Sequence, residues 1–465
     1  MTGELAGPTV VHLGLGNFHR AHQAVYTANA APDWSIVGVA PRSTEIVQAL
    51  RRQRHAYHVL TLGPGRADAS RISVHRDSLT ARTEPERLRD WIADSHTRVV
   101  TLTVTERGYS YQSDGNLDLS APDVEADVKG IGRRGHQPRT VLGHLVAGLW
   151  ARAEAAAGPL SVVSCDNLAG NGPLTARVVR QMAAALEAPF ADDLTRWITA
   201  SVSFPSTMVD RMVPATTARH RSLVQQLTGV TDAVPVVAEP FTMWVLEDHF
   251  LGGRPPWELD GAVFSAEVAA FEDMKLSLLN GTHSLVACLG LLRGHATIAE
   301  AVRDELVSDV AFAYMTDEVL PHIHLPEDVD ARAYVQSLLE RFANPELGHT
   351  CRQVASEGST KLPQRLAPVM TRAMAGGTCP TYSALTVAAW LAVVLDARYD
   401  DVVEMDRAAV RASARACPSD PIRHYVEGGP FGRLADGDRV VGHVAEMQAA
   451  ISRSGISSVL ASTTT

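Results

Sequence analysis

The chain has 465 residues, which is more than a single hydrophobic core usually supports, so two domains are expected. Hydrophobic residues make up 46% of the chain and charged residues 20%, as in an ordinary globular protein. A formal net charge of -10 argues against a nucleic-acid partner, because such binding relies on clustered Lys and Arg side chains.

The first part of the chain has the pattern of a dinucleotide-binding α/β unit. A buried strand is predicted at Thr9 to Leu15, and a glycine turn, a helix over Arg20 to Ala31 and a second strand over Trp34 to Ala40 follow it. In such a unit the pyrophosphate lies at the N-terminus of the helix. Later strands at Val99 to Thr105 and Leu160 to Ser164 alternate with helical segments, which predicts a parallel sheet covered on both faces.

Beyond about residue 265 helical periodicity replaces the strand pattern. Helices are predicted at Phe271 to Leu292, Thr297 to Val307, Ala331 to Phe342 and Ser383 to Leu395. We therefore expect a Rossmann-like α/β domain over residues 1–264 and a mainly α-helical domain over residues 265–465. The low-complexity end of the chain, Ser457 to Thr465, is expected to be frayed.

Cysteine usage and hydropathy indicate the compartment. The five cysteines follow neither a metal-ligand spacing nor an even disulfide set, and they are Cys165, Cys288, Cys351, Cys379 and Cys417. The N-terminus shows no secretory signal, and the longest mainly apolar run, Ala384 to Leu395, is too short to span a bilayer. We expect a cytoplasmic protein without membrane contact, either a monomer or a small homo-oligomer.

The glycine turn reads G-L-G-N-F-H from Gly14 to His19, so His19 replaces the third glycine of the G-x-G-x-x-G motif. The bare G-x-G is a weak motif that an ordinary β-turn would also explain. Its place after a strand and before a helix favours phosphate binding. After the second strand, Glu45 can accept a hydrogen bond from a ribose 2′-hydroxyl, which favours NAD. Arg42 can instead pair a 2′-phosphate, so NADP stays an alternative.

Thr105 and Glu106 follow the strand predicted at Val99 to Thr105. Ligands of an open α/β sheet bind in the crevice at the carboxyl ends of the strands, so these two residues are candidates for the nicotinamide or ribose pocket. A strand end followed by a helix cap is the alternative.

The segment Glu272 to Leu285 carries an amine, an amide and an imidazole on an apolar frame. In an α-helix Asn280 would lie roughly 140° and His283 roughly 80° around from Lys275, so all three face one side within about 12 Å. That side would form a small polar site. The alternative is an ordinary helix with a solvated lysine, an asparagine at a turn and a hydrogen-bonded core histidine.

Several stretches resemble, in the same order, sequence blocks of the polyol-specific long-chain dehydrogenase/reductase family, also called the mannitol dehydrogenase family. They are G-L-G-N-F-H-R-A-H-Q (Gly14 to Gln23), T-V-T-E-R-G-Y (Thr103 to Tyr109), S-C-D-N (Ser164 to Asn167), F-P-S-T-M-V-D-R (Phe204 to Arg211), K-L-S-L-L-N-G-T-H (Lys275 to His283) and E-R-F-A-N-P (Glu340 to Pro345). The resemblance implies an NAD-dependent oxidoreductase that interconverts a polyol and its 2-ketose without a metal. It also implies that the backbones of Gly14, Gly16, Asn17 and Phe18 approach the diphosphate.

The resemblance implies catalytic roles as well. Lys275 would be the general base, for which a lysine must titrate below its usual pKa of about 10.4. Asn167 and Asn280 would donate to the developing oxyanion, because neutral amides stabilise negative charge without protonating it. His283 would donate to a neighbouring substrate hydroxyl, and Asp210 would orient polar groups or help to place Lys275.

The family's basic positions in the helical domain match Arg341 and Lys361, which would hold the far hydroxyls or a carboxylate of the substrate. In the stretch E-P-F-T-M-W (Glu239 to Trp244), Thr242 stands where uronate-reducing relatives carry an arginine, and Met243 replaces an amide. The missing guanidinium favours a neutral polyol, a mannitol-like hexitol or pentitol.

Two other functions stay open. One is fructuronate reductase (D-mannonate oxidoreductase) activity, for which Arg341 and Lys361 would have to hold the carboxylate. The other is a dinucleotide-binding sensor without catalysis, against which the intact set of Lys275, Asn280 and His283 argues.

Overall fold

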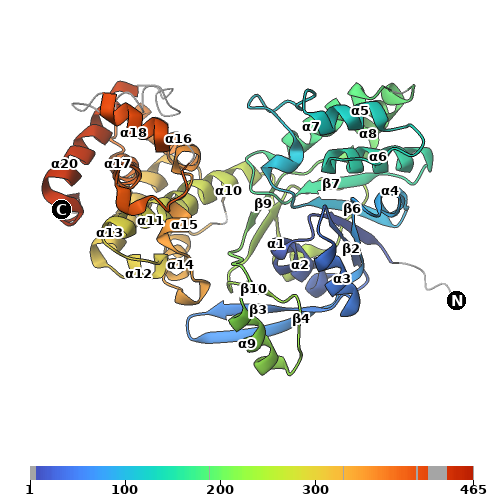
Figure 1. The fold of residues 1–465 in the computed structure, drawn as a ribbon, viewed down its shortest axis with the longest axis horizontal. Coiled ribbons are helices and arrows are strands. Elements are labelled where there is room, and N and C mark those ends of the chain that lie inside the picture. The colour runs from blue at the N-terminus through green and yellow to red at the C-terminus, as the bar shows by residue number, and fades with distance from the viewer. Residues whose placement is uncertain (1–6, 188, 328, 405–406, 417–436, 464–465) are drawn as a thin grey trace. The chain divides into compact units, whose positions relative to one another are not determined.

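The computed structural model describes residues 7–187, 189–327, 329–404, 407–416 and 437–463, so Cys417 lies outside the described residues. The chain forms two compact units, Met1–Ala269 and Ala270–Thr465, which are described separately (Figure 1). Over the described ranges, every helix is too short or too polar to cross a membrane. Cys165, Cys288, Cys351 and Cys379 are free thiols.

The first unit is built on a six-stranded sheet with the strand order β5-β2-β1-β6-β7-β8, in which every neighbouring pair is parallel. Its strands are β1 (Thr9–Leu13), β2 (Ser35–Ala40), β5 (His75–Thr80), β6 (Thr97–Leu102), β7 (Leu160–Ser164) and β8 (Val202–Ser203). The predicted parallel sheet is confirmed. The chain runs outward from β1 in one direction and returns to β6 on the other side, so a topological switch point lies between β1 and β6.

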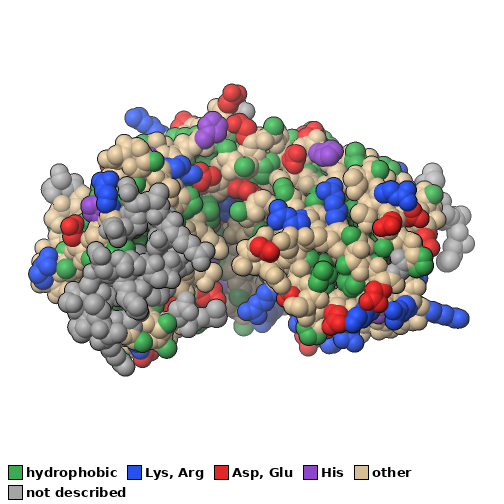
Figure 2. Space-filling model, turned by 90° about the horizontal axis from the view of Figure 1, so that it is seen from above, with side chains coloured by type: hydrophobic (Ala, Val, Ile, Leu, Met, Phe, Trp, Pro, Cys, Tyr) green, Lys and Arg blue, Asp and Glu red, His purple; other side chains and the backbone are tan. Residues whose placement is uncertain are grey.

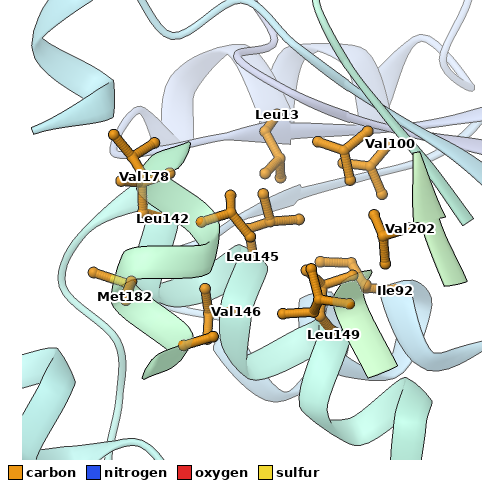
Figure 3. Packing of buried hydrophobic residues seen from close by; sticks show 14 of the residues in the cluster. Leu13, Ile92, Val100, Leu142, Leu145, Val146, Leu149, Val178, Met182 and Val202 are labelled. Carbon is orange, nitrogen blue, oxygen red and sulfur yellow. The ribbon is translucent and has the colours of Figure 1, made fainter. Parts of the chain in front are cut away.

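Helices cover both faces of this sheet, because side chains of one strand alternate between two hydrophobic clusters. Val11 and Leu13 belong to the cluster under α4 (Pro85–Ala93), α5 (Pro122–Gly130), α6 (Val141–Glu154), α7 (Asn171–Ala185) and α8 (Ala191–Ser201). Figure 3 shows Leu142, Leu145 and Leu149 of α6 packed in that cluster. Val10 belongs to the cluster under α1 (Asn17–Ala21), α2 (Gln23–Ala30) and α3 (Thr44–Arg52). Each such aliphatic side chain contributes about 1.5 to 3 kcal/mol by burial.

Two smaller sheets complete the first unit and were not predicted. One has the order β10-β3-β4, with β3 (Tyr57–Gly63), β4 (Arg66–Ile72) and β10 (Val236–Ala238), and α9 (Ala218–Thr228) packs on it. The other has the order β12-β11-β9, with β9 (Thr207–Asp210), β11 (Met243–Leu246) and β12 (Val263–Phe264). Most of these strands are too short to show a periodic pattern. The helix predicted at Arg20 to Ala31 is interrupted at His22, whose φ of -126° and ψ of -90° separate α1 from α2.

The second unit is mainly helical, as predicted. Its helices are α10 (Val268–Met274), α11 (Thr282–Leu292), α12 (Ile298–Ala301), α13 (Glu305–Ala313), α14 (Ala331–Phe342), α15 (Cys351–Ala355), α16 (Gly358–Ala375), α17 (Thr381–Leu395), α18 (Arg407–Ala416) and α20 (Gly437–Thr463). The apolar helix α11 packs against α15 and α17 at the centre of this unit. The part of Ser457 to Thr465 that the structure describes is not frayed as expected, because α20 continues through Thr463 and buries Val459 and Leu460.

Figure 2 shows basic and acidic side chains interspersed on the face in view. Local ion pairs are common among the described residues, and Arg254 is an example, with Nε 2.9 Å from Asp248 Oδ1 and Nη1 2.7 Å from Glu258 Oε2. Exposed pairs of this kind contribute little to stability, about 0 to 1 kcal/mol each.

Candidate active site

The glycine turn after β1 is fixed by backbone crowding at Gly14. Its φ is 113°, and a Cβ there would lie 2.0 Å from the carbonyl oxygen of Thr103, so only glycine fits. The Gly14 amide donates to the carbonyl of Val39 (2.9 Å), and Thr103 Oγ1 donates to the carbonyl of Gly14 (2.9 Å). These bonds hold the turn between the ends of β1, β2 and β6, at the switch point.

Packing within the protein does not explain why residue 16 is a glycine. It is exposed, and the nearest neighbour of a Cβ there would be the Gly14 carbonyl oxygen at 3.6 Å, an ordinary contact. Asn17 begins α1 directly afterwards, and its Oδ1 accepts a hydrogen bond from Arg20 Nη2 (2.7 Å). Phe18 is half-buried and stacks on His22 with ring centroids 5.0 Å apart. Open space above the backbone, next to a helix start, fits a diphosphate.

His19 replaces the third glycine of the motif with a buried imidazole. It stacks on His12 with ring centroids 3.4 Å apart, and its Nε2 lies 3.0 Å from Nε2 of His75. Burial lowers the pKa of His12 and the pKa of His75 to about 3, and it holds the pKa of His19 well below its usual value. The three rings therefore form a neutral packing layer between α1 and the sheet.

Glu45 lies in the first turn of α3, directly after β2, and is exposed. An acid at this place can reach the ribose of a dinucleotide whose diphosphate lies at the glycine turn. Arg42 is exposed in the same connection. The residues present in the first unit thus fit a nicotinamide dinucleotide.

The segment after β6 is held by Asp166, which the sequence analysis did not single out. The Asp166 carboxylate accepts hydrogen bonds from the amides of Val104 (2.9 Å) and Thr105 (2.8 Å) and from Tyr109 Oη (2.7 Å). Burial raises the pKa of Asp166. Thr105 has φ 63° and ψ 167°, a region that costs a residue with a side chain about 1 to 3 kcal/mol. The sequence feature that could have revealed Asp166 is its place as an acid at a strand end, in S-C-D-N.

Asn167 is the next residue, and it is exposed at the carboxyl end of β7. Because β7 pairs in parallel with β6, Asn167, Thr105 and Glu106 lie at the same edge of the sheet, next to the switch point. Glu106 is exposed, and its Oε1 accepts a hydrogen bond from Tyr111 Oη (2.7 Å).

Asp210 and Thr242 are neighbours at one end of the β12-β11-β9 sheet of the first unit. Asp210 is buried at the end of β9 and pairs with Met243, the residue after Thr242. Thr242 is exposed, and its Oγ1 donates to Tyr26 Oη (3.3 Å). The amide of Met212, two residues after Asp210, donates to Glu239 Oε1 (2.7 Å), three residues before Thr242, and so joins these two stretches of the chain.

In the second unit, Lys275 begins a π-helix, η3 (Lys275–Gly281), between α10 and α11. The expectation of regular α-helical geometry is therefore wrong for this segment. A π-helix bonds residue i to residue i+5, so Lys275 and Asn280 take the relation that i and i+4 have in an α-helix, and they lie on one side. His283 follows Asn280 by three residues and shares its face in α11. Lys275 is buried and Asn280 half-buried.

His283 carries a buried Nε2 that has no hydrogen-bond partner within the described part of the chain. Its ring stacks on Phe342, with centroids 5.0 Å apart, and lies near His349, with centroids 5.9 Å apart. Burial keeps the pKa of His283 well below its usual value, and electrostatic interactions with His349 and Arg365 lower this pKa further. A neutral imidazole with an unused polar atom is suited to a ligand hydroxyl.

Basic side chains gather near His283. Arg341 is buried in the last turn of α14. Lys361 lies in the first turn of α16, where its Nζ donates to the carbonyl of Ser356 (2.8 Å), and burial lowers its pKa. Arg365, four residues later on the same face, was not singled out from the sequence. Its Nη1 donates to Ser284 Oγ (2.7 Å) and to the carbonyl of Asn280 (3.3 Å).

The structure thus divides the predicted site between the units. The glycine turn, Glu45, Thr105, Glu106, Asn167, Asp210 and Thr242 belong to the first, and Lys275, Asn280, His283, Arg341 and Lys361 to the second. Among the described side chains, no group of three or more His, Cys, Asp or Glu residues is arranged to hold a metal ion.

Comparison with known proteins covers both units. Residues 8–259 match the family model described as the mannitol dehydrogenase Rossmann domain, and residues 267–449 match the mannitol dehydrogenase C-terminal domain. Mannitol 2-dehydrogenase of Cereibacter sphaeroides is 34% identical, over 97% of this chain and 95% of that protein. D-mannonate oxidoreductase of Escherichia coli (strain K12) is 38% identical, over 82% of this chain and 79% of that protein. The solved ternary complex of Pseudomonas fluorescens mannitol 2-dehydrogenase with NAD and D-mannitol is 32% identical and has a TM-score of 0.83, covering 99% of this chain and 94% of that chain.

Proposed function

Because the chain belongs to the mannitol dehydrogenase family of oxidoreductases, we propose that it interconverts a polyol, a mannitol-like hexitol or pentitol, and its 2-ketose with NAD. The observation that carries this proposal is the row of Lys275, Asn280 and His283 along one side of a π-helix and the helix after it. This row supplies a base, an amide donor and an imidazole in the order that oxidation of a secondary alcohol requires.

NAD, when bound, would supply the hydride acceptor for this reaction. The backbones of Gly14, Gly16, Asn17 and Phe18 would hold its diphosphate, since Gly16 leaves open space beside the start of α1. Glu45 would accept a hydrogen bond from the ribose 2′-hydroxyl. Arg42 in the same connection supports NADP as a second cofactor. Thr105 and Glu106, at the neighbouring strand end, would line the nicotinamide or ribose pocket.

Lys275 would accept the proton of the substrate hydroxyl during oxidation and return it to the ketone oxygen during reduction. Its burial supports this role, because burial is one of the conditions under which a lysine can work as a base near neutral pH. Asp210, itself buried, would orient polar groups of the substrate.

Asn167 and Asn280 would donate hydrogen bonds to the oxygen that gains negative charge, so no metal is needed at that oxygen. His283 would bond a neighbouring hydroxyl through its buried Nε2. That atom supports the role, because a buried polar group that lacks a partner costs about 1 to 3 kcal/mol until a ligand satisfies it.

A second candidate is reduction of a sugar acid such as fructuronate, and the surroundings of Arg365 favour it. Within the described part of the chain, the Arg365 guanidinium has no carboxylate partner, and Arg341 and Lys361 add positive charge around His283. A substrate carboxylate would pair with the Arg365 guanidinium through two hydrogen bonds. The similarity to D-mannonate oxidoreductase of Escherichia coli supports the same alternative.

A substrate panel with both nicotinamide cofactors tests these proposals. Mannitol, arabinitol and sorbitol are offered with NAD or NADP, and fructose, fructuronate and tagaturonate with the reduced cofactors. We expect turnover of a polyol and its ketose with NAD. Preference for fructuronate would select the second candidate. Tight NAD binding without turnover of any open-chain sugar derivative would instead indicate the catalytically inactive sensor.

A further inference from the structure

A second π-helix in the helical unit contacts the one that carries Lys275. This helix, η4 (Tyr314–Val319), begins at Tyr314, a fully buried residue. Tyr314 Oη donates a hydrogen bond to the carbonyl of Ser277 (3.2 Å), which lies between Lys275 and Asn280 in η3. The contact joins two parts of the chain that are 37 residues apart.

Gly281 shows how closely Tyr314 approaches η3. A Cβ on Gly281 would lie 2.3 Å from Tyr314 Oη, which is closer than non-bonded atoms can come, and 3.1 Å from Cζ, a tight contact. The φ of Gly281 is -62°, an ordinary helical value, so glycine is not needed here for its backbone freedom. The glycine after Asn280 is therefore explained by the space that the tyrosine hydroxyl fills.

A π-helical segment needs support from outside itself. The wider turn interrupts the usual i to i−4 ladder of hydrogen bonds, and a buried carbonyl in such a segment requires a donor. Tyr314 provides one at Ser277, which is itself buried. Burial also keeps the pKa of Tyr314 well above its usual value, so its hydroxyl remains a proton donor throughout the range in which enzymes work.

We propose that Tyr314 is a positioning residue that holds η3 in its π-helical form and so keeps Asn280 on the side of Lys275. The inference rests on the proposed function, in which these two side chains act on one substrate oxygen. If the segment relaxed to an α-helix, Asn280 would lie about 140° around from Lys275 instead of next to it, so the base and the oxyanion donor would lie farther apart. Misplacement of a reacting group by about 1 Å can lower a rate about a hundredfold.

Tyr399 provides a matched control within the same unit. Its Oη donates to the carbonyl of Leu291 in α11 (2.8 Å), and it is also buried, but its bond lies at the far end of α11 from Lys275. Tyr314→Phe and Tyr399→Phe each remove one buried hydroxyl donor to a helix carbonyl. We expect both to lower the melting temperature by similar amounts. Only Tyr314→Phe should lower kcat, by about tenfold to a hundredfold, with the Kd for NAD unchanged.

Gly281→Ala tests the same contact from the other side. The added methyl group should displace η3 and lower kcat, because it cannot share the space of Tyr314 Oη. In the double variant Gly281→Ala/Tyr314→Phe the hydroxyl is gone, so kcat should be no lower than in Gly281→Ala alone. If Tyr314→Phe does not fold, the Gly281→Ala measurement decides the proposal.

Equal kcat values for Tyr314→Phe, Tyr399→Phe and the wild type would overturn the positioning role. The role would also be overturned if the loss of kcat in the double variant equalled the product of the losses in the two single variants, since residues that act through one contact do not behave independently. Lys275→Ala is measured in parallel. Full turnover in that variant would overturn the proposed function itself, whereas its inactivity together with a fully active Tyr314→Phe would overturn only the inference.

Discussion

Lys275 and Asn280 are five residues apart and lie close together around the axis of a π-helix, whereas an α-helix would place them about 140° apart. π-helical turns inside α-helices occur frequently at functional sites. Here the turn gives a reason for the spacing K-x-x-x-x-N, since the side chains at its two ends become neighbours along one face.

Replacing Lys275 by alanine should abolish most turnover, because it removes the proposed base. Loss of a general base typically lowers kcat by about two to four orders of magnitude. Binding of NAD, measured by fluorescence titration, should remain nearly unchanged, because Lys275 belongs to the helical unit and not to the glycine turn. Lys129→Ala, which removes an exposed lysine paired with Glu125, is the control and should be fully active. Wild-type turnover in Lys275→Ala would refute the mechanism.

Replacing Asn280 by alanine should lower kcat and kcat/KM together. An oxyanion donor acts mainly in the transition state, and removal of one donor costs about a hundredfold to a thousandfold. The side chains of Ser284 and Arg365 donate to the backbone carbonyl of Asn280. The alanine variant keeps this carbonyl, so the fold should be kept. Asn29→Ala, at an exposed amide that pairs with Asp260, is the control. A rise in KM at constant kcat would assign Asn280 to ground-state binding instead.

Local patterns in the sequence were sufficient for the elements that they fully determine. The strand at Leu160–Ser164 and the helix at Ala331–Phe342 were predicted with the bounds that the structure has. In both elements the spacing of apolar residues along the segment itself determines which side chains are buried. The glycine turn was also predictable, because Gly14 is required by a close approach that the strand, turn and helix order implies.

What the sequence could not show depends on contacts between distant segments. The π-helix at Lys275 is an example, because its partner Tyr314 lies far along the chain and the periodicity of the sequence does not predict their contact. Asp166 was overlooked for the same reason, since its role appears only when the end of β6 lies beside it. Arg365 could have been noticed, because it follows Lys361 by four residues on a helix.

Chelators should leave the activity unchanged. In the proposed mechanism the amides of Asn167 and Asn280 stabilise the oxyanion, so the reaction needs no Lewis acid. The enzyme is incubated with EDTA or with 1,10-phenanthroline, desalted and assayed beside an untreated sample. Activity that is lost with the chelator and restored by added zinc would show that the amides are not sufficient.

The first unit should lose stability in weak acid because of His12, His19 and His75. Burial lowers the pKa of each ring, so the folded state binds fewer protons than the unfolded chain, in which histidine titrates near 6.5. Their contribution to stability is therefore complete above pH 6.5 and is lost as the pH falls below it. Each histidine contributes a slope of about 1.4 kcal/mol per pH unit.

Melting temperatures between pH 7.5 and 5 would measure this effect. His75→Gln should flatten the dependence, because a neutral amide replaces one ring and can still bond His19 Nε2. His96→Gln, at an exposed histidine, should leave it unchanged. An identical pH dependence in His75→Gln and the wild type would show that this ring is not protonated on unfolding.

The preference for a charged over a neutral substrate should change in opposite directions when Thr242 and Arg365 are replaced. We expect the wild type to prefer a neutral polyol or ketose. Thr242→Arg introduces a guanidinium that can pair with the carboxylate of a sugar acid, and it should shift the preference toward fructuronate. A charged hydrogen bond contributes about 1.5 to 3 kcal/mol, so the ratio of kcat/KM values should change about tenfold to a hundredfold. Arg365→Leu should lower turnover of fructuronate more than turnover of fructose, because an unpaired carboxylate in a closed site is penalised by desolvation. Arg365→Lys retains a cation and is its control. If the wild type already reduces fructuronate more efficiently than fructose, and Arg365→Leu removes that preference, the neutral-substrate proposal is wrong and Arg365 is part of the carboxylate site.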